Sequence, residues 1–227
     1  MNILQSIWHG VEFVTAQIVA VVGVNLALEE PPYILLDRIS DTVEIRQYSN
    51  RIVAETTIDL SGGDSPAMTD EEASSQGFRR IAGYIFGANI SKQSQGESSQ
   101  EIPMTAPVEI NNESIAMTAP VEISASKTMT MRFVMPSQYR LETLPTPNDK
   151  RVILKEIPGE TLAVLSYSGR RKFETITEKA SELTDALSTS QWRLGPSAQL
   201  RQFYYNPPWT LPFFRRNEVA FEVVAKP

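Results

Sequence analysis

The hydrophobic pattern of the chain opens with alternation rather than with helical spacing. The runs 33–39, 43–48 and 51–60 alternate apolar with polar residues and are rich in β-branched side chains, which is typical of strands. Short polar turns at 40–41 and 49–50 separate the three runs. The sequence therefore predicts an antiparallel meander in this region.

A helix is predicted after the meander, over residues 69–87. Thr69 is followed three positions later by Glu72, the spacing of a capping box that starts a helix. Gly83 lies inside the helix, where glycine costs about 1 kcal/mol relative to alanine. We therefore expect close packing against a strand or a ligand at Gly83. One face of the helix carries Ser74, Phe78, Ile81 and Ile85.

The second part of the chain runs through a similar order of elements. Residues 152–157 and 160–168 are predicted to pair as a hairpin across the turn formed by Pro158 and Gly159. The elements expected after this hairpin are a helix with apolar positions at Phe173, Ile176, Ala180, Leu183 and Leu187, and strands at 198–205 and 218–224.

The repeated order indicates an internal duplication. Two strands, a helix and further strands occur twice, in halves of about 33–136 and 150–225. The economical interpretation is an α+β fold in which each half lays one helix across a strongly bent antiparallel sheet. We expect residues 31–227 to form a single domain, preceded by an extension at residues 1–30.

The N-terminal extension has the spacing of an amphipathic helix, with apolar residues every three or four positions. Its densest apolar run, 18–28, is too short to span a bilayer. No Lys or Arg precedes Arg38, so the basic region of a secretory leader is lacking. We favour a helix that packs on the domain or lies on a membrane surface; a cleaved or membrane-spanning segment is the alternative.

Composition narrows the classes of function. The chain has 227 residues, 41% of them hydrophobic and 21% charged, as in ordinary globular proteins. A net charge of −6 argues against nucleic acid as a partner. Cysteine is absent and the single histidine is His9, which excludes thiolate ligation, a bis-histidine haem site and a Ser-His-Asp triad in the main body. We expect a cytoplasmic protein, with membrane association and export left open.

The most unusual stretch is 102–136, which contains the string MTAPVEI twice, at Met104–Ile110 and Met117–Ile123. We predict that the two copies form a hairpin with its tip near Asn112. The stretch holds five of the seven methionines, which offer a soft and polarisable surface to a flat apolar ligand. The alternative is that the methionines fill the core and the prolines set a kink at a barrel rim.

Four strings together resemble the SOUL haem-binding protein family over about residues 33–224. They are the doubled MTAPV, GFRRIAGYIFG (77–87), RFVMPSQYRLETLPTPND (132–149) and YNPPWTLPFFRRNEV (205–219). The resemblance implies a distorted antiparallel β-barrel flanked by two helices with a pseudo-twofold axis, similar in outline to the ligand-sensing domains of some bacterial regulators. It also implies that haem or another tetrapyrrole binds in an open apolar groove, for carriage or buffering.

The resemblance does not supply an iron ligand. In some family members a histidine is the proposed axial ligand, and this chain has no histidine after His9. The remaining donors are methionine, tyrosine and His9 itself, which would require the N-terminal helix to fold over the groove. We therefore expect haem to be held without a histidine ligand, and the metal-binding residues stay open.

A haem groove needs a flat apolar wall, cations for the propionates and, in some cases, an axial donor. The helix predicted at 77–87 and the methionine-rich strands offer these groups, with Tyr84 as a candidate phenolate. The alternative is that the apolar residues are core and the arginines are solvated. The candidate binding residues are Phe78, Arg79, Arg80, Ile81, Tyr84, Ile85, Met104, Met117, Met131 and Phe133.

Two other functions compete with haem carriage. An enzyme acting on a tetrapyrrole or another apolar substrate is the first, although no acid/base pair can be placed from sequence. The second is a peripheral membrane or partner-binding module that uses residues 1–28 or the loop 209–216. That loop carries aromatic residues beside Arg215 and Arg216, and its alternative role is to pack over one end of the barrel.

Overall fold

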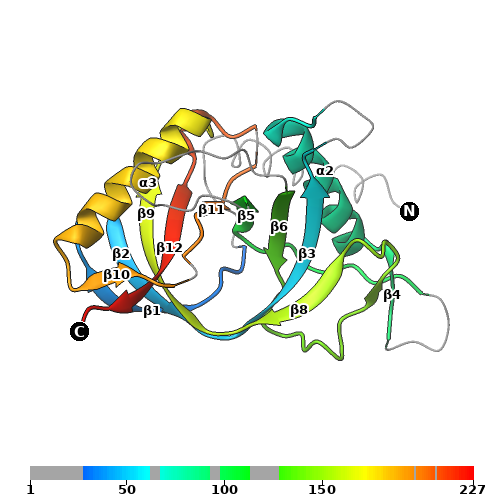
Figure 1. Ribbon diagram of the computed structural model, residues 1–227. Helices are drawn as coiled ribbons and strands as arrows, with labels where there is room; N and C mark the ends of the chain where they lie inside the picture. The colour runs from blue at the N-terminus through cyan, green and yellow to red at the C-terminus, as the bar shows by residue number, and fades with distance from the viewer. Residues whose placement is uncertain (1–27, 62–66, 93–97, 113–127, 197, 208) are drawn as a thin grey trace, which may run out of the picture.

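The computed structural model describes residues 28–61, 67–92, 98–112, 128–196, 198–207 and 209–227. One antiparallel sheet of ten strands curls into a half-barrel, with one long helix on each flank (Figure 1). The predicted α+β class and distorted barrel are confirmed. The helix predicted for the N-terminal extension lies outside the described residues.

The described elements fall into two sets that follow one another along the chain. The first set is β1 (Tyr33–Arg38), β2 (Val43–Tyr48), β3 (Arg51–Asp59), α2 (Asp70–Ile85), β4 (Asn89–Ile90), β5 (Val108–Asn112) and β6 (Thr128–Val134). The second set is β7 (Thr146–Pro147), β8 (Ile153–Ile157), β9 (Glu160–Tyr167), α3 (Phe173–Ser188), β10 (Trp192–Leu194), β11 (Arg201–Tyr204), the 3-10 turn η1 (Pro212–Phe214) and β12 (Asn217–Ala225).

The order of strands in the sheet is the same from both ends, as an internal duplication requires. The sheet runs β1-β2-β9-β12-β11-β5-β6-β3-β8, with β10 added to β12. From β2 inward the order is β2, β9, β12, β11, and from β8 inward it is β8, β3, β6, β5. Each strand therefore occupies the same position in its series as its counterpart from the other half does in the other series. A pseudo-twofold axis therefore passes between β11 and β5, where the two halves join.

One of the three hairpins predicted from short turns is confirmed, because β1 pairs with β2, and the other two are wrong. β2 pairs with β9 and β3 pairs with β8, so neither β2 with β3 nor β8 with β9 is a hydrogen-bonded neighbour. β2 and β3 instead form one long bent strand, and β8 and β9 form another that runs antiparallel beside it. At the bend, Asn50 accepts a 2.7 Å hydrogen bond from the backbone N–H of Gly159. A Cβ at Gly159 would lie 2.9 Å from the Tyr48 carbonyl oxygen. A turn of two residues can bend a strand as well as reverse it, and here tertiary pairing selects the bend.

For the doubled string, the structure gives sheet partners only to the end of its first copy. β5, which contains the end of that copy, pairs with β6 on one side and with β11 on the other. Both edges of β5 are therefore occupied by other strands over residues 108–111. The second copy, Met117–Ile123, lies outside the described residues.

Helix α2 begins as predicted. It packs closely on the sheet at Gly77, however, and not at Gly83 as predicted. Thr69 and Glu72 form the capping box, with the Thr69 backbone N–H donating to Glu72 at 2.9 Å. A Cβ at Gly77 would lie 2.9 Å from Ile58 Cδ1, whereas a Cβ at Gly83 would meet no described heavy atom within 4 Å. Six residues place Gly83 about 120° around the helix from Gly77, so Gly83 points away from the sheet.

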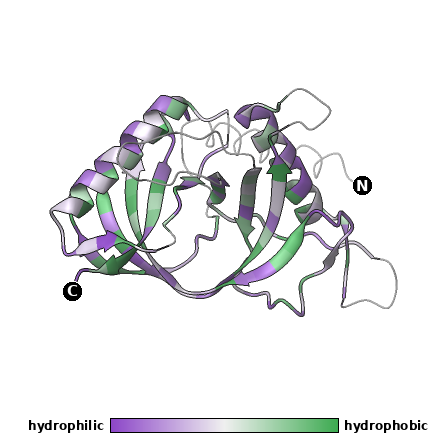
Figure 2. Ribbon diagram, viewed as in Figure 1, coloured by the Kyte–Doolittle hydropathy of each residue, from purple (hydrophilic) through white to green (hydrophobic). Residues whose placement is uncertain are grey.

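Each helix covers its own hydrophobic core on the same face of the sheet. The core under α2 contains Ile81, Ile85, Met131 and Phe133, and the core under α3 contains Leu183. Figure 2 shows hydrophobic and hydrophilic segments alternating along the strands beside both helices. Because side chains alternate across a strand, the other face of the same strands carries a second set of residues.

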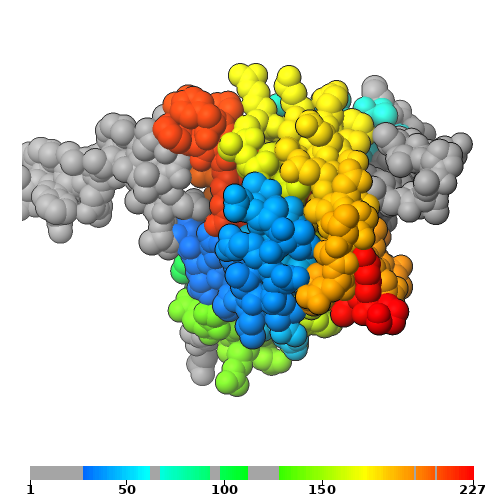
Figure 3. Space-filling view, turned by 90° about the vertical axis from the view of Figure 1, so that its left-hand side faces the viewer, coloured from blue at the N-terminus to red at the C-terminus, as the bar shows by residue number. Residues whose placement is uncertain are grey.

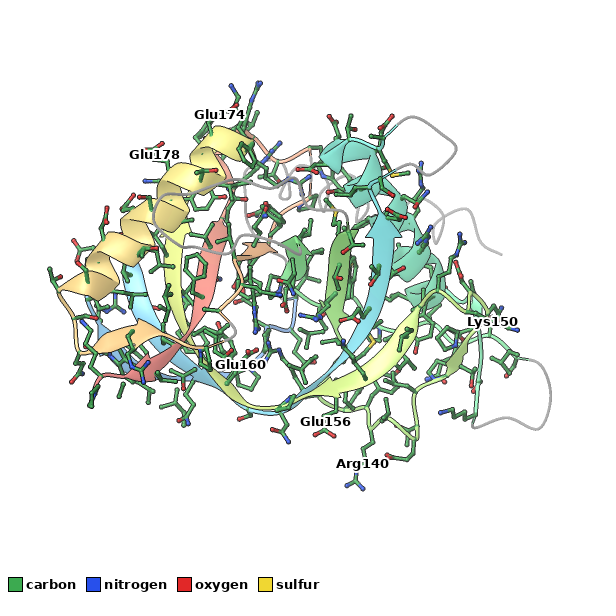
Figure 4. The ribbon with its side chains drawn as sticks, viewed as in Figure 1. Arg140, Lys150, Glu156, Glu160, Glu174 and Glu178 are labelled. Carbon is green, nitrogen blue, oxygen red and sulfur yellow. The ribbon has the colours of Figure 1, made fainter. Side chains whose placement is uncertain are left out.

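That opposite face carries a network of buried and half-buried ion pairs near the axis between the halves. Glu160 lies 2.5 Å from Arg51 and 2.6 Å from Arg201, which come from different halves. Glu109 contacts Arg132 at 3.0 Å and is almost fully buried. Figure 4 shows Glu160 between the two flanks of the half-barrel. The network links β3, β5, β6, β9 and β11 on the face without helices.

Candidate functional site

A cleft of about 710 Å³ lies between the N-terminal ends of α2 and α3. Its volume is in the range of small-molecule sites. The floor comes from central strands of the sheet and one wall from the loop before β12. The residues that line it are Asp70, Glu71, Ser74, Ile110, Met129, Arg170, Arg171, Lys172, Phe173, Ile176, Thr177, Leu200, Gln202, Tyr204, Trp209, Thr210, Leu211, Pro212 and Arg215.

The floor of the cleft combines apolar side chains with Gln202 and Tyr204 of β11. Ile110 on β5 and Met129 on β6 are buried beside Tyr204, whose hydroxyl donates to the Gln202 side-chain oxygen. These residues lie on the helix-bearing face because Leu200, Gln202 and Tyr204 alternate with Arg201 and Phe203 along the strand. The floor therefore continues the core under α2 out to the cleft.

Cations gather on one rim of the cleft. Arg170, Arg171 and Lys172 precede α3, and Arg215 follows η1 on the facing loop. Burial lowers the pKa of Arg215 below its ordinary value, and repulsion from Arg171 and Arg170 adds to this effect. Crowded cations that repel one another form a favourable place for an anion.

Hydrogen bonds fix the two cationic segments to one another. The backbone N–H of Gly169 donates to the Pro212 carbonyl at 2.9 Å, and the Asn217 side chain donates to the Gly169 carbonyl at 3.2 Å. Gly169 has φ of +120°, a conformation that side-chain-bearing residues rarely adopt. The Arg171 guanidinium carbon lies 4.5 Å from the centroid of the Tyr204 ring, which places this cation over the floor.

The start of α3 adds to the positive potential at the same rim. Lys172 is the N-cap, and its side chain makes no capping hydrogen bond within the described structure. The first N–H groups of a helix lack partners inside the helix and carry partial positive charge. A carboxylate bound beside Phe173 would therefore meet both side-chain cations and backbone donors.

The remaining rim, on α2, has the opposite sign. Asp70 and Glu71 belong to the first turn of that helix and line the cleft. Near the floor, burial raises the pKa of Tyr167 to about 12, although the nearby charge of Arg171 opposes that rise. The Tyr167 hydroxyl has no hydrogen-bond partner in the described part of the chain. The cleft is thus polar at its edges and apolar at its centre.

Two lining residues carry atoms that ligate iron in some proteins, and neither is set up as a strong ligand. The Met129 sulfur accepts a 3.6 Å hydrogen bond from the Ser74 hydroxyl and is buried. Burial raises the pKa of the Tyr204 hydroxyl far above its ordinary value, which disfavours the phenolate. The described residues contain no cluster of three His, Asp or Glu side chains that could hold a metal ion, and His9 lies outside them.

Most of the binding residues predicted on α2 pack that helix on the sheet. Ile81, Tyr84 and Ile85 are buried, and the Tyr84 hydroxyl donates to the Pro145 carbonyl at 3.0 Å. Phe78 is exposed by 37% and its ring lies 5.5 Å from that of Phe133, which is buried. None of these side chains lines the cleft between the helices, and their contact with a ligand stays a prediction.

The two arginines predicted for the propionates lie in different surroundings. Arg79 is exposed. Arg80 donates to the Gln76 side chain at 2.8 Å and to the Thr57 carbonyl at 3.3 Å, so it binds the helix to β3. Their role as ligands for a carboxylate stays a prediction.

The predicted methionines separate into three groups. Met131 is buried under α2, Met104 is half-buried against the same core, and Met117 lies outside the described residues. Met129 is the methionine that reaches the cleft among the described residues. Its neighbour on the strand face, Met131, contacts the helix instead.

Sequence reasoning missed the cations at 170–172, although a signal was present. Three consecutive basic residues directly precede a predicted helix, which places them at the positive end of its dipole. The loop 209–216 was considered as a membrane or partner surface, and in the fold its Trp209, Leu211 and Arg215 line the cleft. Only the fold shows that both segments meet at one rim.

Helices long and apolar enough to cross a bilayer are absent from the described part of the chain.

Comparison with known proteins adds a family and a fold. The sequence model of a family described as SOUL heme-binding protein matches residues 28–222. The chain is similar to Heme-binding protein 1 of Xenopus laevis, with 28% identity over 156 residues that cover 66% of this chain and 71% of that protein.

Solved structures share the architecture at low sequence identity. The C-terminal domain of EcmrR has a TM-score of 0.54 and 13% identity, covering 81% of this chain and 97% of that one. A hydrolase from Listeria innocua has a TM-score of 0.55 and 13% identity, covering 81% of this chain and 92% of that one. At these identities the likeness shows the fold alone.

Proposed function

Because the chain belongs to the SOUL haem-binding family, we propose that it binds haem or another tetrapyrrole in the cleft between α2 and α3 and acts as a carrier or buffer. Family membership supports tetrapyrrole binding in general terms. The carrier role and the position of the ligand are the parts that we add.

One observation carries the choice of this cleft: an apolar floor borders a cluster of cations. A tetrapyrrole is a flat apolar ring with carboxylates at one edge, so it needs these two environments side by side. Ile110, Met129 and the Tyr204 ring supply the floor, and Arg171 and Arg215 border it. The other cleft of comparable size, about 400 Å³, borders Arg140 and Glu142 and has no comparable cluster of cations among its described lining.

The cleft offers only weak ligands for iron, which favours reversible binding. With Met129 engaged by Ser74 and the Tyr204 hydroxyl held protonated by burial, ring burial and carboxylate contacts supply most of the affinity. Such a ligand can leave without breaking a strong metal bond, as carriage or buffering requires. An enzyme would also need groups placed for proton transfer or redox chemistry on the ring, and we assign no such role to the lining residues.

The proposal is tested by titrating the full chain with haemin and following the Soret band. Wild type should saturate, and Arg171→Gln and Arg215→Gln should each weaken binding by about threefold to tenfold, since each removes a charge-assisted contact with a carboxylate. Arg140→Gln is the matched control, because Arg140 is exposed away from the cleft (Figure 4), and it should bind as wild type does.

A second titration uses haemin with both propionates esterified, which lacks the carboxylates that the arginines are proposed to bind. It should bind more weakly to wild type, and the two arginine variants should lose no further affinity for it. The site predicted on α2 gives the opposing result: if Phe78→Ser and Arg79→Gln weaken binding while Arg171→Gln and Arg215→Gln do not, the ligand lies on α2 and our placement is wrong. Absence of any saturable Soret change would reject tetrapyrrole binding itself.

A further inference from the structure

The loop between β11 and β12 presents large apolar side chains to solvent. Trp209 is exposed by 60%, Phe213 by 66% and Phe214 by 45%. The η1 turn that holds both phenylalanines contributes no buried residue. The sequence-based alternative, in which this loop packs its aromatic residues over the barrel end, therefore does not describe these three side chains.

This loop forms one surface with the start of α3. Phe173, the first residue of α3, is 51% exposed, and the Gly169 to Pro212 hydrogen bond joins the two segments. In the space-filling view of Figure 3, the orange-red loop before β12 projects from the molecular surface beside the yellow start of α3. We call Phe173, Trp209, Leu211, Phe213 and Phe214 the aromatic surface.

Cations flank the aromatic surface, beside the acidic Glu174 in the first turn of α3. Arg170, Arg171 and Lys172 are exposed, and Arg215 is half-buried directly after η1. The segments 168–173 and 209–216 contain no acidic residue. This local charge is positive on a chain whose net charge is −6, so the partner of the surface is selected by charge as well as by apolar contact.

We infer that the aromatic surface docks the protein onto membranes that carry anionic lipids. Tryptophan and phenylalanine insert at the boundary between headgroups and acyl chains, while adjacent arginine and lysine side chains bind lipid phosphates. A rigid projecting loop can insert its tip without unfolding the domain. The proline-rich sequence and the bonds to Gly169 give the loop that fixed shape.

Docking in this way orients the cleft toward the lipid. Trp209, Leu211 and Phe173 belong both to the aromatic surface and to the cleft lining. An apolar ligand dissolved in the bilayer would thus reach the floor of the cleft with little passage through water. Docking of the aromatic surface on a membrane does not depend on tetrapyrrole binding.

The test is sedimentation of the full chain with vesicles of phosphatidylcholine alone or mixed with phosphatidylserine. We expect binding to the anionic vesicles, weakened at high salt because salt screens exposed charges. Phe213→Ser should reduce partitioning by about tenfold, the effect of withdrawing one phenylalanine from an apolar contact. Phe86→Ser is the matched control, since Phe86 is 63% exposed at the other end of α2, and it should partition as wild type does.

Two results would overturn the inference. If Phe213→Ser partitions as wild type does, any membrane binding comes from another part of the chain. If the chain does not sediment with either vesicle type but binds a soluble acidic polypeptide such as polyglutamate, the surface docks a protein. Phe213 does not line the cleft, so haemin titration of the same variants measures the proposed function separately.

Discussion

At the scale of single residues, Met129 shows how a methionine can border a binding site without serving as a ligand. Its side chain is 2% exposed and lies at the junction of the α2 core and the cleft. Its sulfur already accepts a hydrogen bond from Ser74. A flexible thioether in this position fills space that a branched side chain fills less well.

Met129→Leu should leave haem binding almost unchanged. The two side chains have similar volume, so the cost in stability should stay below about 1.5 kcal/mol. The Soret position of bound haem should also stay the same, because no bond to iron is lost. A clear shift of the Soret band in Met129→Leu, with wild-type folding by circular dichroism, would identify Met129 as an axial ligand and contradict our account of the cleft.

At the scale of elements, the position of α2 is set by one glycine and not by the other. Gly77 lets the helix approach Ile58 and Met131 on β3 and β6, whereas a Cβ at Gly83 would contact none of the described residues. Glycine in a helix costs free energy because its backbone is freer in the unfolded chain. The cost at Gly77 is offset by close packing, and the cost at Gly83 has no such compensation among the described residues.

The two glycine-to-alanine substitutions should therefore differ in their effect on the free energy of unfolding. Gly83→Ala should raise it by about 0.5 to 1 kcal/mol. Gly77→Ala should be less stable than Gly83→Ala by roughly 1 to 3 kcal/mol, since the added methyl group must displace Ile58. Chemical denaturation of the pair measures the difference directly. Equal stability of the two variants would show that α2 can shift away from the sheet at no cost.

At the scale of the whole molecule, ion pairs near the pseudo-twofold axis tie the halves together. Glu160 of the second half forms ion pairs with Arg51 of the first half and with Arg201 of its own half. Burial raises the pKa of the Glu160 carboxyl, but hydrogen bonds and charges from Arg201 and Arg51 outweigh burial and hold the pKa below its usual value of 4.5. The native state therefore favours the ionised form of Glu160.

Glu160→Gln should lower the free energy of unfolding at neutral pH by about 1 to 3 kcal/mol, because two half-buried arginines lose their nearest carboxylate and keep only the more distant Glu109. A carboxyl with a lowered pKa stabilises the fold above its unfolded pKa and loses that effect as the pH falls through its folded pKa. The difference between wild type and Glu160→Gln should thus shrink below about pH 4.5. Denaturation curves at neutral and acid pH test this.

Glu178→Gln is the control for Glu160→Gln, because Glu178 is exposed on the outer side of α3 (Figure 4). Its stability should follow wild type at both pH values. If Glu160→Gln matched Glu178→Gln at neutral pH, the ion pairs between the halves would add nothing to the fold.

The local pattern of the sequence determined the two long helices, most of the long strands and the duplication, whereas the short strands β4, β7 and β10 were not predicted. The capping box at Thr69 and the apolar spacing of α3 depend on residues that lie within a few positions of one another, so they are visible without the fold. The strands near 43–48 and 51–59 were predictable for the same reason. The pairing of β1 with β2 was predictable as well, but the pairing across Asn50 was not, because the turn there permits either a hairpin or a bent strand.

The candidate site was likewise predictable only where it depends on residues close together in the sequence. The sequence by itself determined the family, the two helices and the presence of an aromatic loop beside Arg215. Only the tertiary structure decided that this loop meets residues 170–172 across one cleft, and that the apolar face of α2 packs against the sheet. The physical reason is that burial and convergence depend on contacts between residues far apart in the chain, and those contacts arise when β11 and β5 join the two halves.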